Sequence, residues 1–420
     1  MQAPEVETSS PRSDLLRSGM LTVLALGSFL LLLGLGCRAR HHQTPIATGD
    51  GGTRLLIGGR EPVVLNRSQS DGGLVPEFVS ATLLPGRGMN LLQLTAYLPG
   101  TGVVPLLDSP SPGEINPLLA DTNADRNGAV TAGFGGAFLL PFDSRNSGTL
   151  SQDGQSLAIP WHGQTLSLPV DAAAAPGAPP IASNGLFNAQ AASSVEVDAL
   201  PDGEMATAVY EPGDFGGRWP STTRVTVVVT LTRKDVDLTV TALNTGSAPE
   251  PMAIGWRPFF IIPSGHRGEA LLHLPTTDRL LSAAGLPTGR MQPVAGTPYD
   301  FTTLDGTQLG AQPLDDTFVH IRSGGLGGLM DSDPAAELRD RGAQYGLRVV
   351  PQSSNIKAFH VATPAARPTA LSIAPQMSLD DPFNKQWQED PGVVTLAPGD
   401  SVEWKVRLEL FLPTQTSIIP

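Results

Sequence analysis

Apolar and polar residues alternate along several segments of this chain. Val225 to Leu231 and Val236 to Asn244 each repeat with a period of two, and only Thr-Arg-Lys-Asp separates them. Successive side chains of a strand point to opposite faces, so this pattern predicts an antiparallel hairpin with one buried face. The segment 396–410 alternates in the same way, and its predicted strand turns these side chains inward: Val402, Trp404, Val406, Leu408 and Leu410.

Shorter segments with strand-like composition fill much of the chain after residue 53. They cover residues 79–85, 86–95, 156–169, 355–364 and 369–376. Glycine and proline are abundant, with 46 and 39 residues, and no long segment after residue 53 shows the 3.6-residue period of an amphipathic helix. Such a profile favours many turns and short strands. The sequence therefore predicts an all-β fold, with surface loops at residues 108–130 and 172–180.

One predicted surface loop contains side chains with the alternate spacing of a calcium-binding loop. Asp121, Asn123 and Asp125 could present oxygen atoms in turn to a hard cation. However, Arg126 stands where such a loop has glycine, and Ala132 stands where it has its last glutamate ligand. A turn-rich surface loop is therefore the favoured interpretation, and no metal or cofactor is expected.

Composition and charge narrow the class of protein further. The chain has 420 residues, of which 40% are hydrophobic, which is enough for a substantial core. Its formal net charge is -13, and like charges do not form blocks. Nucleic-acid binding depends on clustered basic residues, so no nucleic-acid partner is expected.

The N-terminal region has the features of an export segment. Met20 to Gly36 is an uncharged and mostly apolar run, Arg12 and Arg17 precede it, and Cys37, the only cysteine of the chain, follows directly. This order resembles a bacterial lipoprotein signal, which implies lipidation of Cys37 and removal of the residues before it. Gly34 stands where that signal usually has leucine, and two alternatives stay open: an uncleaved membrane anchor and a plain secretion signal.

These interpretations divide the chain into three parts. Residues 1–37 form the export segment, residues 38–53 form a polar and flexible tether, and residues 54–413 form one folded domain. The expected location is the bacterial cell envelope, where a lipoprotein anchored in the membrane would face the periplasm or the exterior. Contact with the membrane would run through the N-terminal lipid or the apolar segment.

The segment Pro251 to Pro263, PMAIGWRPFFIIP, is apolar apart from Arg257. An unpaired buried charge is costly, so Arg257 must either reach solvent or find a partner. The segment follows the predicted hairpin and an Asn-Thr-Gly turn, and it contains Gly-Trp-Arg-Pro-Phe-Phe at residues 255–260. This order resembles the aldose 1-epimerase (galactose mutarotase) family, whose motif is Gly-x-His-Pro-Tyr-Phe. The resemblance places Arg257 where the family has its general-acid histidine.

Further matches follow along the chain in the same order as the motifs of the family. A glycine-rich segment of this chain resembles the family segment that carries a sugar-binding arginine, and Arg145 stands at the position of that arginine. Asn184 stands in place of a histidine that holds the sugar, and Asp315 stands in place of an aspartate that reaches a sugar hydroxyl. In the last of these matches, Ala374 stands in place of the catalytic glutamate, whereas Gln376 is kept.

The resemblance implies both a fold and a site. The fold is a β-supersandwich of two large antiparallel sheets packed face to face. The implied substrate contacts are Arg145, Asn184, Trp256, Arg257, Asp315 and Gln376. We expect Arg145, Arg257 and Asp315 to converge on one pocket, where a carboxylate could support the arginine charges.

Mutarotation needs a base that takes the anomeric hydroxyl proton and an acid that protonates the ring oxygen, and each such group is typically worth roughly 10²–10⁴ in rate. Arg257 stays charged and Ala374 cannot accept a proton, so neither position holds a group that moves protons. The sequence therefore favours an exported carbohydrate-binding protein that is at most a weak mutarotase. Its partner would be an aldose or an oligosaccharide.

Two other hypotheses stay open. The first is an active aldose 1-epimerase that uses substitute groups, with Asp315 or Asp380 as the base and His266, His320 or His360 as the acid. The second is a structural envelope protein whose pocket is vestigial.

Overall fold

In the computed structural model of the protein, the alternating segments form the strands that they predict. β11 (Thr223–Thr232) pairs with β12 (Asp235–Asn244), and β12 pairs with the closing strand β26 (Ser401–Phe411). On β26, Trp404, Val406 and Leu408 are buried in the core, and the remaining two predicted positions pack against it in part. The predicted hairpin and the inward face of the last strand are both confirmed.

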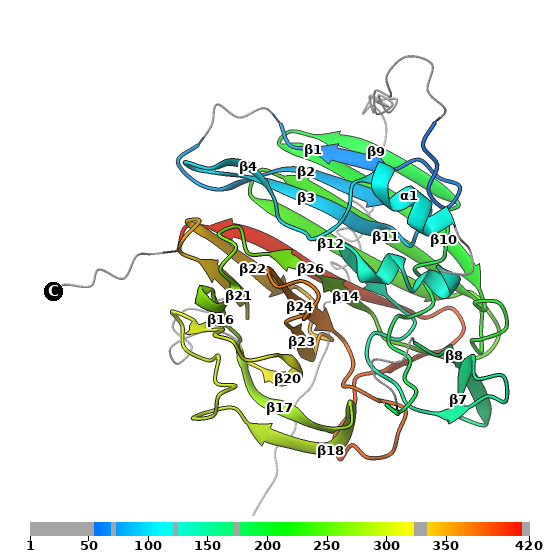
Figure 1. Ribbon diagram of the computed structural model, residues 1–420. Coiled ribbons are helices and arrows are strands. Elements are labelled where there is room, and N and C mark those ends of the chain that lie inside the picture. Colours follow the sequence, from blue (N-terminus) through cyan, green and yellow to red (C-terminus); the bar gives the residue numbers. More distant parts are fainter. Residues whose placement is uncertain (1–53, 69–72, 121–124, 172–176, 323–333, 414–420) are drawn as a thin grey trace, which may run out of the picture. The chain divides into compact units, whose positions relative to one another are not determined.

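The structure describes residues 54–68, 73–120, 125–171, 177–322 and 334–413 (Figure 1). All of them belong to one compact unit, Gln43–Pro420. The expected export segment at 1–37, the expected tether at 38–53 and Cys37 lie outside the described residues. The described part contains no helix that is both long and apolar enough to span a membrane.

Two antiparallel sheets contain most of the strand residues in the described ranges. The larger sheet has the strand order β1-β2-β3-β5-β14-β24-β23-β20-β17-β18, with β4 paired to β3 and β15 paired to β24. Its strands are β1 (Val63–Asn66), β2 (Glu77–Leu84), β3 (Asn90–Leu98), β4 (Gly102–Pro105), β5 (Gly136–Leu139), β14 (Gly255–Pro258), β15 (Phe260–Ile261), β17 (Thr276–Ala283), β18 (Leu286–Pro293), β20 (Asp315–Ile321), β23 (Ala358–Ala362) and β24 (Ala370–Gln376).

The second sheet has the order β19-β16-β21-β22-β26-β12-β11-β10-β9. Besides β11, β12 and β26 it contains β9 (Ser194–Leu200), β10 (Gly203–Gly213), β16 (Leu271–His273), β19 (Thr307–Gln308), β21 (Ala336–Asp340) and β22 (Tyr345–Pro351). Two small sheets join β6 (Thr149–Leu150), β7 (Ser156–Trp161) and β8 (Gln164–Pro169), and β13 (Glu250–Met252) with β25 (Val394–Leu396). The predicted all-β class with large antiparallel sheets is confirmed.

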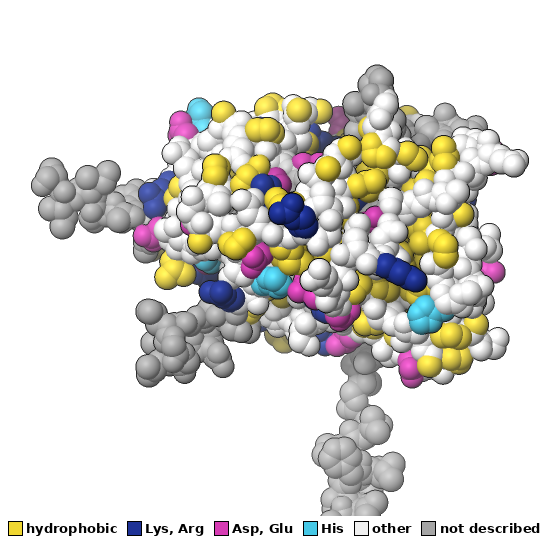
Figure 2. Space-filling model, turned by 90° about the horizontal axis from the view of Figure 1, so that it is seen from below, with side chains coloured by type: hydrophobic (Ala, Val, Ile, Leu, Met, Phe, Trp, Pro, Cys, Tyr) yellow, Lys and Arg dark blue, Asp and Glu magenta, His cyan; other side chains and the backbone are white. Residues whose placement is uncertain are grey.

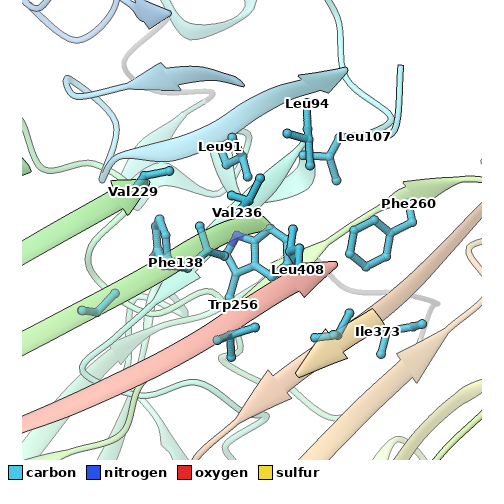
Figure 3. Close-up of a cluster of buried hydrophobic side chains, with 14 of the residues drawn as sticks. Leu91, Leu94, Leu107, Phe138, Val229, Val236, Trp256, Phe260, Ile373 and Leu408 are labelled. Atoms are coloured by element: carbon cyan, nitrogen blue, oxygen red, sulfur yellow. The ribbon is translucent and has the colours of Figure 1, made fainter. Parts of the chain in front are cut away.

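The two large sheets share one hydrophobic core, which Figure 3 shows around Trp256. Leu91 and Ile373 come to it from the larger sheet, and Val229 and Leu408 come from the second sheet. Burying large apolar side chains of this kind contributes about 1.5–3 kcal/mol each, so the core is the main source of stability of the described unit.

Trp256 belongs to this core and not to a binding site. Its side chain is fully buried, its ring meets Phe260 edge to face, and Gly136 lies so close that an added Cβ would stand 2.4 Å from the indole. Trp256 and Arg257 are neighbours on β14, so their side chains leave the strand on opposite faces. The substrate contact predicted for Trp256 is therefore wrong.

One α-helix stands within the segment predicted as the loop 108–130. α1 (Pro112–Ala120) begins after Ser111, whose backbone N–H donates to Glu114 at 2.8 Å, while the Glu114 N–H is 3.4 Å from the Ser111 hydroxyl. This reciprocal pair is a capping box, and proline suits the first helical position. The 3-10 turns are η1 (Arg126–Gly128), η2 (Thr131–Gly133) and η3 (Arg267–Glu269).

Candidate functional site

A cavity of about 200 Å³ opens on the larger sheet. Its titratable and charged lining consists of Asp143, Arg145, Arg257, Asp315, His360 and Asp380. Its apolar wall consists of Leu139, Phe259, Ala362 and Ala374. The cavity therefore combines several hydrogen-bonding groups with a limited apolar surface.

The order of four neighbouring strands brings these side chains together. β14 lies beside β24, β24 beside β23, and β23 beside β20. His360 on β23 pairs in register with Ala374 on β24, and Asp315 on β20 pairs with Ala362 on β23. Residues two apart on a strand share a face, so Ala374 and Gln376 both reach the cavity.

Arg145, Asp315 and His360 form a charged network at the cavity. A side-chain nitrogen of Arg145, Nη2, makes an ion pair with Oδ1 of Asp315. Nε2 of His360 lies 3.2 Å from that same oxygen and 3.2 Å from Nη2 of Arg145. The imidazole donates to Asp315 when Nε2 carries a proton, and it accepts from Arg145 when Nε2 does not.

The charges in this network stabilise each other. Partial burial would raise the pKa of Asp315, but the hydrogen bond of His360 and the charge of Arg145 hold it well below its usual range. Burial would lower the pKa of Arg145, whereas the carboxylates of Asp380 and Asp315 raise it above its usual value. Asp315 is therefore ionised at neutral pH, and 66% of its side-chain surface stays exposed.

Arg257 is held by neutral groups. Its Nη2 donates to the Ala132 carbonyl oxygen at 3.1 Å and to the Asn184 amide oxygen at 2.5 Å. The amide nitrogen of Asn184 donates in turn to Asp171 at 2.7 Å. Burial lowers the pKa of Arg257, and the more distant charge of Asp171 opposes that effect. Within the described ranges, no carboxylate forms an ion pair with Arg257 and its buried Nε has no hydrogen-bond partner.

Asn184 thus acts behind the cavity. It is not part of the cavity lining, whereas Ser183 beside it is. Its amide links the guanidinium of Arg257 to the carboxylate of Asp171. The direct substrate contact predicted for Asn184 does not fit this placement, and its role in the structure is to position Arg257.

Asp143 is a site residue that the sequence did not single out. It is 3% exposed and accepts hydrogen bonds from the backbone N–H groups of Met377 at 2.6 Å and Ser378 at 3.2 Å, and from the Ser378 hydroxyl. Burial raises its pKa to about 6, although these hydrogen bonds act in the opposite direction. The sequence did contain a sign that Asp143 belongs to the site, because this acidic residue stands in an apolar segment, two positions before Arg145.

Phe259 supplies the aromatic surface that Trp256 does not. It lines the cavity with Arg257, two residues before it, and the Arg367 guanidinium stands 4.4 Å from the centre of its ring. The two-residue spacing from Arg257 was the signal that both side chains lie on the same side of the chain.

The predicted contact Gln376 and the candidate base Asp380 line the cavity from the segment that begins at β24. Gln376 is 3% exposed, and its amide nitrogen donates to the Ser378 carbonyl oxygen at 2.7 Å. Asp380 is also 3% exposed, and it accepts a hydrogen bond from the Thr317 hydroxyl at 2.9 Å. Their partners fix both side chains in place.

Only one of the three candidate acids reaches the cavity. His360 lines it, whereas His266 and His320 are not part of its lining. His320 instead contacts Asp278 at 2.9 Å and Glu389 at 3.2 Å. As substitute acids, His266 and His320 are therefore excluded by their position.

Candidate metal ligands do not gather in the described part of the chain. No three His, Cys, Asp or Glu side chains there form a cluster that could hold a metal ion. Asp121 and Asn123 lie outside the described residues, and Asp125 pairs with Arg87 at 3.0 Å and accepts from the Thr131 hydroxyl at 2.9 Å. On the face shown in Figure 2, the acidic and basic side chains are interspersed.

Solved structures of other proteins share this fold. Solved structures with the same fold include a galactose mutarotase-like protein from Clostridium acetobutylicum, with 16% identity, a TM-score of 0.64 and coverage of 83% of this chain and 98% of that chain. A GalM/aldose epimerase homologue from C. elegans has 15% identity, a TM-score of 0.60 and coverage of 83% and 99%. A putative aldose 1-epimerase from Escherichia coli K12 has 15% identity, a TM-score of 0.55 and coverage of 83% and 99%.

At these identities the solved structures show the fold alone. No curated protein sequence matches the chain significantly. The profile of the family described as aldose 1-epimerase, however, matches residues 114–409, which include all the predicted sugar-contact positions. The chain therefore belongs to the aldose 1-epimerase family.

Proposed function

We propose that this protein binds an aldose or the end of an oligosaccharide in the cavity and interconverts its anomers slowly or not at all. One observation carries the proposal: Arg257 and Ala374, which occupy the acid and base positions of the motif resemblance, both line the cavity. An arginine keeps its proton at any working pH, and a methyl group takes none. Other side chains of the cavity can hold sugar hydroxyls, whereas the residues at these two positions cannot transfer protons.

The remaining lining suits a sugar ring. Asp315 accepts hydrogen bonds, Arg145 donates them, and Gln376 can do both. Phe259 offers an apolar face of the kind on which the C–H face of a pyranose ring packs. Arg145 and Gln376 can hold a hydroxyl without transferring a proton, which supports binding over catalysis.

Isothermal titration calorimetry with glucose and galactose tests the binding. We expect saturable binding that weakens at least about tenfold in Arg145→Gln, because a charge-assisted hydrogen bond to a hydroxyl is lost. Arg224→Gln is the matched control, since Arg224 pairs with Glu211 on the second sheet and outside the cavity. Equal affinities of the two variants, or absence of saturation with every sugar and sugar derivative tested, would contradict the proposal.

An active epimerase is the second candidate, and the position of His360 favours it. His360 faces the cavity next to Asp315 and is paired in register with Ala374. From there the imidazole could exchange a proton with a sugar hydroxyl, with Asp380 as a buried second group. This candidate predicts faster mutarotation of α-galactose that His360→Asn abolishes, as followed by polarimetry. An unchanged rate in that variant would eliminate it.

We further propose that the protein is exported and held at the membrane of a bacterial cell envelope by lipid on Cys37. A single cysteine directly after an apolar run supports this. Labelling of growing cells with a radioactive fatty acid should mark the protein and leave Cys37→Ser unmarked. A membrane-bound but unlabelled wild type would point to an uncleaved helix instead.

A further inference from the structure

We propose that the natural ligand is a sugar acid whose carboxylate binds to Arg257. This inference rests on the proposed sugar-binding function and specifies its ligand class. It begins from the unequal charge balance of the two arginines that line the cavity, Arg145 and Arg257.

Arg145 has its counter-charge within the protein. Its guanidinium contacts Asp315 directly and also feels the charge of Asp380. A neutral sugar could therefore occupy the cavity without changing the charge balance around Arg145.

Arg257 has no such counter-charge among the described residues. Its two hydrogen bonds use Nη2 alone and run to neutral oxygens, those of Ala132 and Asn184. Among the described carboxylates, Asp171 acts on Arg257, and it does so from behind Asn184. A guanidinium carries five N–H donors in a planar fork, so donors remain for a ligand at the cavity.

Neighbouring positive charges add to this imbalance. Arg145 and Arg367 both lie close enough to disfavour the charge on Arg257. Asp108 pairs with Arg367 at 3.4 Å and does not form an ion pair with Arg257. An anion seated beside Arg257 would offset the burial of its charge, because a charge-assisted pair favours the ionised guanidinium.

The chemistry of the remaining lining favours a carboxylate over a phosphate. Asp143, Asp315 and Asp380 also line the cavity. A phosphate group carries about -1.5 to -2 charges at pH 7, so these carboxylates would repel it more than they repel a singly charged carboxylate. The planar guanidinium can pair with two oxygens of either group, so the difference in charge decides between them. A uronic acid, whose carboxylate replaces the exocyclic hydroxymethyl group, carries the single negative charge that this lining favours.

Calorimetry on the full-length protein tests the inference with three matched probes. They are glucuronate, its neutral methyl ester and glucose 6-phosphate. We expect glucuronate to bind about ten- to a hundredfold more tightly than the ester, since a hydrogen bond to a charged group is the difference between them. This preference should shrink in Arg257→Gln and persist in the control Arg224→Gln.

The outcomes separate the inference from the function on which it rests. Equal affinities for glucuronate and its methyl ester in the wild type overturn the sugar-acid inference, and this comparison does not depend on the folding of any variant. Tighter binding of glucose 6-phosphate than of glucuronate assigns the site to phosphate and also overturns it. If glucose, galactose and all three probes fail to bind, the proposed function fails together with the inference.

Discussion

Glu250 gives a sharp test of the physical reasoning about buried charge in this fold. It stands at the start of β13 and is fully buried. One carboxyl oxygen accepts a hydrogen bond from the Thr223 hydroxyl at 2.9 Å, and the other has no partner among the described residues. Burial therefore raises the pKa of Glu250 from its usual 4.5 to about 7. Replacement by glutamine keeps the shape and removes the titrating group.

The size and sign of the effect follow from proton linkage. A gap between pKa values of 4.5 and about 7 corresponds to about 3 kcal/mol. The folded state holds this proton more tightly than the unfolded state, so ionisation of Glu250 opposes folding. The contribution of Glu250 to the free energy of unfolding is most favourable below pH 4.5, falls as the pH rises toward 7, and stays constant above that.

Urea unfolding at pH 5 and pH 8, followed by tryptophan fluorescence, measures the effect. At pH 8, Glu250→Gln should raise the free energy of unfolding by up to about 3 kcal/mol, and this gain should fall to about 1 kcal/mol or less at pH 5. The control Glu211→Gln changes a side chain that is 46% exposed, and it should show no such dependence on pH. A gain of equal size at both pH values, or no gain at pH 8, would refute the reasoning.

Three further substitutions test the site and the core. Gly136→Ala should lower the free energy of unfolding by about 1–3 kcal/mol in urea titrations, because its Cβ collides with the Trp256 indole; an unchanged value would contradict the close packing. Asp143→Ala should cost about 1–3 kcal/mol for each backbone N–H that loses its acceptor, and wild-type stability in the same assay would contradict this role. Phe259→Ala should weaken glucose binding several-fold in calorimetry, since Phe259 is the aromatic residue of the cavity; unaltered affinity would show that the sugar packs elsewhere.

Local patterns predicted the strands well. The period-two alternation of Val225 to Leu231 and of the segment ending at Leu410 depends only on which face of a strand is buried, and both segments form strands. The helix α1 was not predicted, because no hydrophobic periodicity marks it in the sequence. Its capping box between Ser111 and Glu114 was present in the sequence and would have indicated the helix start.

The candidate site was predictable only in part. The same alternation rule could have separated Trp256 from Arg257, since neighbours on a strand face opposite ways. The contact of His360 with Asp315 could not be read from the chain, because it depends on which strands pair. The bridge from Arg257 through Asn184 depends in the same way on tertiary structure, which brings residues 73 positions apart into contact.

Polarimetry of freshly dissolved α-glucose and α-galactose tests most directly whether the site has lost its proton-moving groups. The presence of Arg257 and Ala374 at the cavity predicts that optical rotation decays at nearly the spontaneous rate, even when the protein concentration is raised. A rate that increases in proportion to protein concentration and reaches that of an ordinary aldose 1-epimerase would show that the site still transfers protons.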